Sequence, residues 1–335
     1  MNIKLPQLVF DHPHATPVMP ERMMWTTSAT KQWRACKRKF FWKYVYGLRT
    51  HSKGAPLMIG SAFHEAVEEW YRHQRRNMRA IAKKHFTRLE RAAEEQMGMR
   101  EQKQQDKLLA DLFAVRGMLE GYGEVYREDR LQWKYTQKMI EAQFVIDCGD
   151  YDFAGKIDMI RNLTPKTHQI IEHKTASTIT SNYIERLPLD TQIRAYIWGA
   201  QSLGMNPKSV LYDVVRKCKL RGKANESITE FTQRIRNDYI ERKDFYFYRE
   251  ELRFSQGDIE ALRFEVEQCH REFTDALRHG EFDDPRTYLP NDGACTLYNS
   301  TCEYMMLCTV GLDLGTAAAY YQELKQHEEL DVAGK

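Results

Sequence analysis

The chain has 335 residues, of which 50 are lysine or arginine and 47 are aspartate or glutamate, so its formal net charge is +3. This balance excludes a strongly basic tail and an acidic solvating protein, but it is compatible with a local basic groove. With 42% hydrophobic and 12% aromatic residues, the chain is too rich in core-forming side chains to be disordered. The length predicts two domains or one elaborated domain.

The sequence carries no recognisable export or membrane signal. Its first twenty residues contain several prolines and no long apolar run, and no stretch approaches the 18 or so apolar residues of a membrane span. We therefore expect no membrane association and a cytoplasmic location, in a bacterium or a phage-infected host. The seven cysteines are then expected to be thiols or metal ligands rather than disulfides.

In chain order, residues 1–25 are expected to form an irregular arm. Apolar side chains then recur at the three- and four-residue steps of helices, with Thr27 or Ser28 capping the first helix and Gly47 ending it. The expected helices span residues 27–47, 60–97, 105–130, 189–204 and 255–279. Four segments alternate as strands do, at residues 138–149, 153–162, 168–176 and 209–217. This order predicts an α/β or α+β fold with one central mixed sheet flanked by helices.

Two neighbouring expected strands carry charged residues in a pattern that suits a metal. Asp158 ends the segment GKID, and Glu172 and Lys174 lie on the next strand, in IIEHKTA. Side chains alternate along a strand, so Glu172 and Lys174 share one face and His173 points to the other. In a hairpin Asp158 stands beside Glu172, and such a carboxylate pair suits Mg²⁺ or Mn²⁺.

With a lysine to hold a water, these groups are the parts needed to attack a phosphodiester. The alternative is a solvated hairpin with an ordinary surface ion pair. Two further segments favour the site: His64 follows Gly60 by four residues, and Gln192 and Tyr196 lie one helical turn apart. Taken singly, His64 is as well explained by a structural role in its helix, and Gln192 and Tyr196 by an amphipathic boundary.

In order, the pieces are G-x-x-x-H, G-x-x-D, E-x-K and Q-x-x-x-Y. This order resembles the RecB-like branch of the PD-(D/E)XK nuclease superfamily, which includes the AddB nuclease domain, CRISPR-associated iron–sulfur exonucleases and phage exonucleases. The resemblance covers about residues 26–310 and implies a restriction-endonuclease-like core. Ile157 stands where the name-giving proline is found in other branches.

The resemblance also implies a role for each motif residue. The metal ligands would be His64, Asp158, Glu172 and the backbone carbonyl of His173. Lys174 would orient the attacking water. Gln192 and Tyr196 would support the site and line the DNA backbone.

Three cysteines gather near the C-terminus, as Cys295, Cys302 and Cys308, and Cys36 lies far upstream. Such a set can hold zinc or a 4Fe–4S cluster, or its members can be buried thiols. The resemblance implies the iron–sulfur arrangement, in which the cluster ties the two ends of the chain together. Zinc remains the alternative, because the gap between the first two cysteines is wider than expected. The other three cysteines, Cys148, Cys218 and Cys269, are expected to be structural.

Local basic stretches are the candidate DNA contacts. The segment RKCKLRGK follows the fourth strand and contains no acid; its basic residues are Arg216, Lys217, Lys219, Arg221 and Lys223. Residues 34–43 interleave basic and aromatic side chains, which could stack on bases. Residues 72–107 carry eleven basic and five acidic residues, but a solvated helix face explains that segment at least as well.

We therefore expect a RecB-like nuclease domain at residues 26–315. It would contain a helical insertion at 65–137 and the cysteine segment at 285–315, followed by a C-terminal helix or tail at 316–335. The expected function is metal-dependent DNA cleavage by an exonuclease acting on single strands or duplex ends, in recombination, replication or repair, in a phage or CRISPR context. The alternatives are an inactive nucleic-acid-binding module of the same fold and a zinc-stapled interaction protein.

Overall fold

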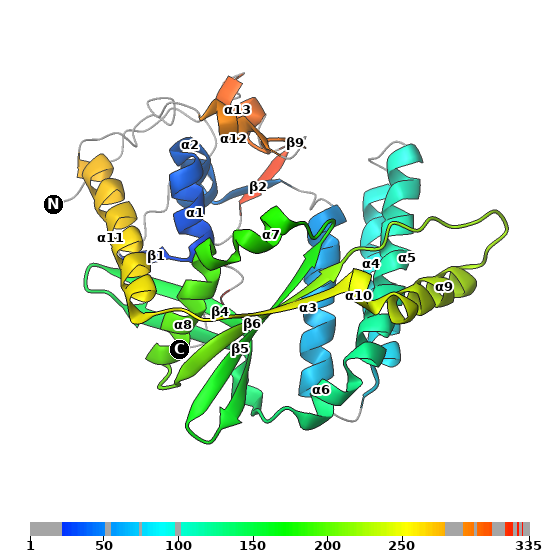
Figure 1. The fold of residues 1–335 in the computed structure, drawn as a ribbon. Helices are drawn as coiled ribbons and strands as arrows, with labels where there is room; N and C mark the ends of the chain where they lie inside the picture. Colours follow the sequence, from blue (N-terminus) through cyan, green and yellow to red (C-terminus); the bar gives the residue numbers. More distant parts are fainter. Residues whose placement is uncertain are drawn as a thin grey trace. The chain divides into compact units, whose positions relative to one another are not determined.

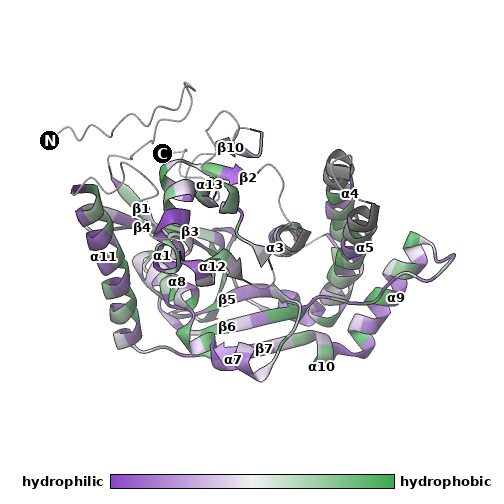
Figure 2. Cartoon of the chain, turned by 90° about the horizontal axis from the view of Figure 1, so that it is seen from above, coloured by the Kyte–Doolittle hydropathy of each residue, from purple (hydrophilic) through white to green (hydrophobic). Residues whose placement is uncertain are grey.

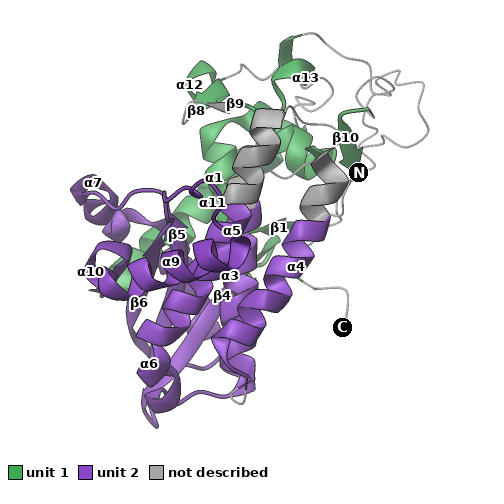
Figure 3. Cartoon of the chain, turned by 90° about the vertical axis from the view of Figure 1, so that its right-hand side faces the viewer, with its two compact units in different colours: residues 1–51, 143–155, 255–335 green, residues 52–142, 156–254 purple. Residues whose placement is uncertain are grey.

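A computed structural model describes residues 22–50, 55–73, 76–97, 102–278, 291–297, 300–309, 319–323, 327 and 330. The chain divides into two compact units (Figure 3). Unit 1 comprises residues 1–51, 143–155 and 255–335, and unit 2 comprises residues 52–142 and 156–254. Each unit is described by itself below.

Six of the described strands form a mixed sheet (Figure 1). The strands, in the order in which they pair, are β1 (Met23–Trp25), β4 (Tyr151–Thr164), β5 (Thr167–Ala176), β6 (Pro207–Arg216) and β7 (Phe247–Leu252), and β3 (Ile140–Asp147) also pairs with β4. The pairs β4–β5 and β6–β7 are antiparallel, whereas β1–β4 and β5–β6 are parallel. The expected α/β fold with a central mixed sheet is confirmed.

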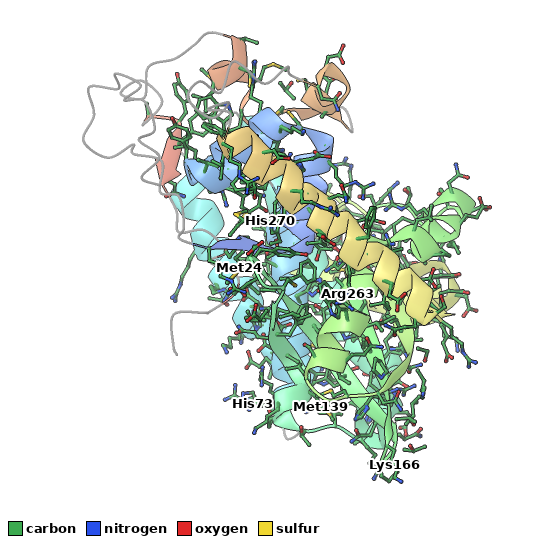
Figure 4. All side chains as sticks on the ribbon, turned by 90° about the vertical axis from the view of Figure 1, so that its left-hand side faces the viewer. Met24, His73, Met139, Lys166, Arg263 and His270 are labelled. Atoms are coloured by element: carbon green, nitrogen blue, oxygen red, sulfur yellow. The ribbon has the colours of Figure 1, made fainter. Side chains whose placement is uncertain are left out.

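The hairpin of β4 and β5 positions the residues that matter most below. Its turn lies at Pro165 and Lys166, where Thr164 Oγ1 accepts hydrogen bonds from the backbone N–H groups of Lys166 and Thr167. Lys166 marks this end of the sheet in Figure 4. Between β3 and β4, Gly149 has a φ of 89°, a left-handed conformation that glycine adopts without steric cost.

Helices of unit 2 build its core against the sheet. They include α3 (Ala55–Arg72), α4 (Met78–Met97), α5 (Gln102–Val125), α6 (Arg127–Gln132), α8 (Thr191–Ser202) and α9 (Ile228–Glu241), with the short helices η2 (Gln137–Met139), α7 (Ser181–Glu185), η3 (Leu187–Leu189) and α10 (Lys243–Tyr246). The core contains large buried side chains such as Phe63, Trp70 and Tyr122. Their burial is the main favourable term that holds the helices to the sheet.

Two glycines let α5 approach α9 closely. A Cβ atom on Gly117 would lie 2.6 Å from Ile235 Cγ2, and one on Gly121 would lie 2.6 Å from Tyr239 Cβ. Real Cβ atoms do not come so close, so the backbone of α5 packs directly on these α9 side chains. Any larger residue at either position would overpack this contact.

Unit 1 is built on aromatic side chains. Its elements are α1 (Thr27–Ala35), α2 (Lys37–Phe40), a π-helical turn η1 (Phe41–Val45), β2 (Leu48–Thr50), α11 (Gln256–Arg278), α12 (Asp292–Cys295), β8 (Thr296–Leu297), β9 (Ser300–Thr301), α13 (Met305–Thr309) and β10 (Tyr321–Glu323). Trp25, Trp33 and Phe40 pack edge-on or stacked around Phe273 of α11. His270 of α11, labelled in Figure 4, accepts a hydrogen bond from Trp25 Nε1 at 3.3 Å.

Helix α11 shows how the sequence pattern selects a buried face. Its buried residues include Ile259, Leu262, Val266 and Phe273, at three- to seven-residue steps. Figure 2 accordingly shows hydrophilic and hydrophobic residues alternating along the helix. Of the helices in the described part of the chain, none combines the length and the apolar character needed to cross a membrane.

Several expected elements differ from those observed. The helix expected at 27–47 breaks at Cys36, whose backbone is extended and whose side chain caps α2. The helix expected at 60–97 is interrupted between α3 and α4, and the one expected at 105–130 is interrupted at Tyr126. The periodicity of apolar residues continues across such breaks, because it indicates which residues face the core and not where the helix ends.

Several short or polar elements were not expected, and four of them are informative. Helix α9 and strand β7 lie where the sequence suggests no regular structure, and the capping box of α9, from Ser227 to Glu230, is the signal that marks its start. Strand β1 falls within the arm expected to be irregular. Strand β10 falls within 316–335, where a helix or tail is expected; residues 1–21 lie outside the described part of the chain.

Several described basic residues of the stretch at 72–107 form ion pairs within the fold. Arg76 and Lys84 both form ion pairs with Glu69, at 2.6 and 2.8 Å, and His85 contacts the same carboxylate at 3.0 Å. Arg72 pairs with Glu68 on its own helix. These pairings favour the structural explanation for this segment over DNA binding.

Glu69 is the centre of that ion-pair cluster and gives a pH-dependent prediction. Burial raises its pKa, but hydrogen bonds from Lys84, His85 and Arg76 outweigh burial and lower it from 4.5 to about 2. A carboxylate whose pKa is lower in the folded state stabilises the fold above pH 4.5 and loses that contribution as the pH falls toward 2. We expect Glu69→Gln to lower the free energy of unfolding at neutral pH, and the difference from wild type to shrink below pH 4.5.

Denaturant unfolding of both proteins across this pH range measures the difference. The control is Glu260→Gln on the exposed side of α11, whose effect should be small and independent of pH. A difference for Glu69→Gln that stays constant down to acid pH would contradict the assignment.

Candidate active site

The antiparallel pairing of β4 and β5 brings two carboxylates together. Met159 pairs with Ile171, so one step along the ladder Asp158 is level with Glu172. Asp158 Oδ2 accepts a hydrogen bond from the backbone N–H of His173 at 2.9 Å. Lys174 forms an ion pair with Glu172 across the two-residue spacing of the strand. The geometry is the one that strand alternation predicts.

Helix α3 supplies a histidine to this pair. His64 Nδ1 lies 3.4 Å from Asp158 Oδ2, and the His64 side chain is 31% exposed. Burial lowers the pKa of His64, but the charge of Asp158, its hydrogen bond with His64 and the charge of Glu172 together outweigh burial, and the net shift is upward. The imidazole therefore faces the same carboxylates as Lys174 does.

Helix α8 holds the lysine. Lys174 Nζ donates a hydrogen bond to Gln192 Oε1 at 2.9 Å, and Gln192 Nε2 donates to Tyr196 Oη at 2.7 Å. Asp190 caps the helix by accepting from the backbone N–H of Gln192. The one-turn spacing of Gln192 and Tyr196 predicts a shared face, and the structure adds their direct link to Lys174.

The charges at this site are strongly coupled. Glu172 is 1% exposed; burial and the charge of Asp158 raise its pKa from 4.5 to about 7, although Lys174 opposes the shift. Burial likewise raises the pKa of Asp158, but the charges of His64 and Lys174 outweigh it, and the net pKa is lowered. Burial lowers the pKa of Lys174, but the charges of Glu172 and Asp158 together outweigh burial. The net pKa is raised, so the ammonium stays charged.

These donors suit a hard divalent cation. Carboxylate oxygens with one imidazole nitrogen match the preferences of Mg²⁺ and Mn²⁺. Apart from the Lys174 ammonium beside it, neither oxygen of Glu172 accepts a well-formed hydrogen bond within the described residues, so the buried carboxylate has capacity for a cation. Among the residues that the structure describes, no three His, Cys, Asp or Glu side chains already converge as a metal site.

A second charged cluster, which the sequence analysis did not predict, lies on the other face of β5. Asp213 on β6 is fully buried; it accepts hydrogen bonds from Tyr122 Oη at 2.7 Å and Arg249 Nε at 3.0 Å. His173 Nδ1 lies 3.0 Å from the same carboxylate. The available signal was an acid in the middle of the apolar strand segment SVLYDVVRK, since a buried carboxylate requires partners.

Glu141 and Lys156 are also close to the site and were not predicted. Glu141 forms an ion pair with Lys156, and both feel the charge of Asp158. The φ of Glu141 is 51°, in the left-handed region that a residue other than glycine adopts only at a cost. Nothing in the local sequence signals this conformation.

The basic loop after β6 divides into two groups. The Arg216 guanidinium lies over the Phe245 ring at 4.2 Å and donates to the carbonyl of Ile179, so it supports the fold. Lys217, Lys219 and Arg221 line a cavity that is described below. Lys223, the remaining predicted DNA contact, is exposed.

The aromatic residues of 34–43 do not serve as expected. Phe40, Phe41 and Trp42 are at most 5% exposed, so they belong to the core and are not available to stack on bases. The basic residues Lys37 and Lys39 form ion pairs with Glu272 and Glu303. Composition alone did not reveal which side of this helical segment faces inward.

The four cysteines predicted as cluster ligands all belong to unit 1. Asn291 Nδ2 donates to the carbonyl of Ala35, next to Cys36, and Cys295 Sγ donates to the carbonyl of Asn291. The backbone N–H of Cys302 donates to the carbonyl of Cys295 at 2.7 Å. These contacts connect the remote cysteine to the C-terminal group.

All seven cysteines are free thiols. Burial raises the pKa of Cys302, although Lys39 opposes the shift, and burial raises that of Cys308 against hydrogen bonds and charge from Trp42 and Arg38. Both thiols therefore sit beside cationic side chains. The three cysteines expected to be structural, Cys148, Cys218 and Cys269, include one buried in α11, Cys269.

Comparison with known proteins gives one extensive match. The family model of the PD-(D/E)XK nuclease superfamily matches residues 24–309, well over half of the chain. Among solved structures, a proposed exonuclease from Eubacterium rectale is 12% identical, with 94% of each chain covered and a TM-score of 0.43. The protein SSO0001 is 11% identical, with 67% of this chain and 78% of that chain covered and a TM-score of 0.24. A search of curated proteins found no match.

The buried Asp213 cluster gives a prediction about stability. Asp213→Asn removes the charge that two Arg249 nitrogens contact, and Arg249 keeps only Asp129 as a charged partner among the described residues. Breaking one half of a buried ion pair costs about 3–5 kcal/mol, and we expect the lower end of this range because Asp129 remains. Urea unfolding of the variant measures the loss.

Asp244→Asn, at an exposed position of α10, is the matched control and should change the free energy of unfolding by less than about 0.5 kcal/mol. Equal stability of Asp213→Asn and wild type would show that the cluster does not hold the sheet together.

Proposed function

Because the chain belongs to the PD-(D/E)XK nuclease superfamily, we propose that it hydrolyses phosphodiester bonds in DNA at the Asp158–Glu172 carboxylate pair. The observation that carries the proposal is the β4–β5 pairing, which sets these carboxylates level with each other and places Lys174 beside Glu172. A solvated hairpin would not need a lysine that is held at once by a carboxylate and by Gln192.

The metal would be held by Asp158, Glu172 and His64, with the backbone carbonyl of His173 as a further ligand. When bound, a divalent cation polarises the scissile phosphate and lowers the pKa of the attacking water. The lone pairs left without well-formed hydrogen bonds at Glu172 support this assignment.

The protein's own residues would position the reaction. Lys174, fixed by Gln192 and Glu172, keeps donor capacity to hold a water in line with the phosphorus atom. Tyr196 fixes the orientation of the Gln192 amide, so its role is to keep the lysine in place. His64 Nδ1 lies 3.4 Å from Asp158 Oδ2, so the imidazole would join that carboxylate as a ligand.

The substrate would approach along the basic loop, where Lys217, Lys219, Arg221 and Lys223 offer charges for phosphates. We propose an exonuclease that acts on single strands or duplex ends, in recombination, replication or repair. The motif resemblance supports the exonuclease mode and a phage or CRISPR setting. Several basic residues of segment 72–107 are already paired with carboxylates, which favours the loop over this segment as the site that receives the DNA.

The test is cleavage of end-labelled DNA with Mg²⁺ or Mn²⁺. We expect Glu172→Gln and Lys174→Met to lower the cleavage rate about a hundredfold or more, because each removes a group that acts on the reacting phosphate or water. Lys208→Met, an exposed lysine on β6, is the matched control and should retain the wild-type rate. Chelation of the metal should stop cleavage, and its re-addition should restore it.

Circular single-stranded DNA tests the mode, since an exonuclease spares a substrate without ends. Unaltered cleavage by Lys174→Met would overturn the site assignment. Metal-independent DNA binding without any cleavage by the wild type would favour the inactive nucleic-acid-binding module instead.

We propose in addition that Cys36, Cys295, Cys302 and Cys308 hold a 4Fe–4S cluster, with zinc as the alternative metal. The contacts that connect Ala35, Asn291 and Cys295 support the proposal, because they bring the two ends of the sequence to the same part of unit 1. Four thiolates are a sufficient ligand set for either metal.

Anaerobically purified protein should therefore contain iron and absorb visible light as an iron–sulfur chromophore does. We expect Cys302→Ser to lose this absorption and to unfold at a lower temperature, because metal binding stabilises the folded state. Cys148→Ser is the control and should keep both properties. Stoichiometric zinc without iron would establish the alternative, and an unchanged metal content in Cys302→Ser would exclude this cysteine as a ligand.

A further inference from the structure

A cavity of about 360 Å³ lies within unit 2, beside the candidate active site. Its floor is apolar and comes from helices: Ile59 of α3 and Val115 and Met118 of α5 are all at most 7% exposed. Its rim comes from the chain that follows β5 and β6 and carries Ser177, Lys217, Lys219 and Arg221. The cavity is small for a ligand site, since such sites span roughly 300–1,000 Å³.

The cavity shares its supporting elements with the site. Ser177 follows the end of β5, three residues beyond Lys174, which at about 3.3 Å per residue is roughly 10 Å along the strand. Helix α3 carries both Ile59 and His64, and a Cβ on Gly60 would lie 3.9 Å from Thr175 Oγ1. The carbonyl of Ala176 accepts a hydrogen bond from Lys217 N at 2.8 Å, which holds the rim to the catalytic strand.

The rim carries a net positive charge even when the carboxylate of Asp111 is included. Asp111 also lines the cavity and interacts with Lys217, so these two charges offset each other. Lys219 and Arg221 are exposed and make no ion pair within the described part of the chain. Two cations thus remain for an anion, above a floor that suits a flat apolar group.

We infer that this cavity binds one unpaired nucleotide of the DNA strand, with its base on the floor of Ile59, Val115 and Met118 and its phosphate between Lys219 and Arg221. The inference rests on the proposed function and names the form of its substrate. A base within a duplex is paired and stacked inside the helix, so it reaches a lateral cavity only after it has left the stack. The cavity therefore favours single strands and frayed ends over intact duplex.

None of the described residues that line the cavity is aromatic, so the base would be held by aliphatic contacts. A small apolar molecule would not need the cations, and inorganic phosphate alone would not need the floor. A nucleotide uses both, which is why charge complementarity selects it here.

The first test needs no variant. Fluorescence anisotropy is measured on a labelled single-stranded oligonucleotide without divalent metal, so that nothing is cleaved and binding is read separately from activity. A single abasic position is then moved along the strand. We expect one position to lower the affinity about tenfold while its neighbours do not, because an abasic nucleotide has no base to bury against the apolar floor. Blunt duplex of the same length should bind more weakly than the single strand.

The second test uses variants of the rim and floor. In Ala114→Phe, which fills the cavity from α5, and in Lys219→Ala/Arg221→Ala, which removes the cations, the abasic position should lose its special effect. Lys223→Ala is the matched control, since it removes a charge from the same loop at a residue that does not line the cavity; it should lower the affinity equally for every abasic position, so the positional effect should persist. Thermal unfolding checks that each variant is folded.

Equal affinity for every abasic position, or a positional effect that survives in both the filled and the rim variants, would overturn the inference. Duplex bound more tightly than single strand would overturn it as well. Absence of cleavage by the wild type with Mg²⁺ or Mn²⁺ would overturn the proposed nuclease function, yet the metal-free binding pattern would still be read independently.

Discussion

The rest of the site depends on the electrostatic repulsion between two buried carboxylates, Asp158 and Glu172. Removal from water and mutual repulsion both disfavour the doubly charged state, and the raised pKa of Glu172 records that cost. The fold answers with positive groups from separate elements, Lys174 from β5 and His64 from α3. Burying these two carboxylates together destabilises the folded state, and a bound divalent cation would neutralise their charges. This explains why such a pair suits a metal site.

The same strand carries charge on both faces of the sheet. Glu172 and Lys174 point to one face, and His173 between them points to the other, toward Asp213. Tyr71 stacks on the His173 ring, and Tyr122 donates to Asp213, so this second cluster is enclosed by aromatic side chains. Side chains on both faces of β5 thus form contacts that hold the strand at His173. These contacts stabilise the hydrogen bond that the His173 backbone N–H donates to Asp158.

Local patterns in the sequence predicted the parts of this arrangement that depend on spacing. Alternation placed Glu172 and Lys174 together, and the helical turn placed Gln192 with Tyr196. The Asp213 cluster could not be predicted, because it joins β5, β6, β7 and α5 through pairings distant in sequence. Phe40, one of the aromatic residues of 34–43, was misjudged for a related reason: it packs against Trp25 and against Phe273 of α11, and Phe273 lies more than two hundred residues away in sequence.

The close contact of α5 with α9 has a consequence for the loop between β6 and α9. Because Gly117 and Gly121 leave no space between the two helices, α9 cannot slide along α5, and β6 is fixed in the sheet. Both ends of the loop are thus anchored before any ligand arrives. A loop with both ends held has less conformational entropy to lose on association than a loop with free ends, so a ligand's affinity would depend more on the contacts it makes and its residence time on how easily it passes the rim.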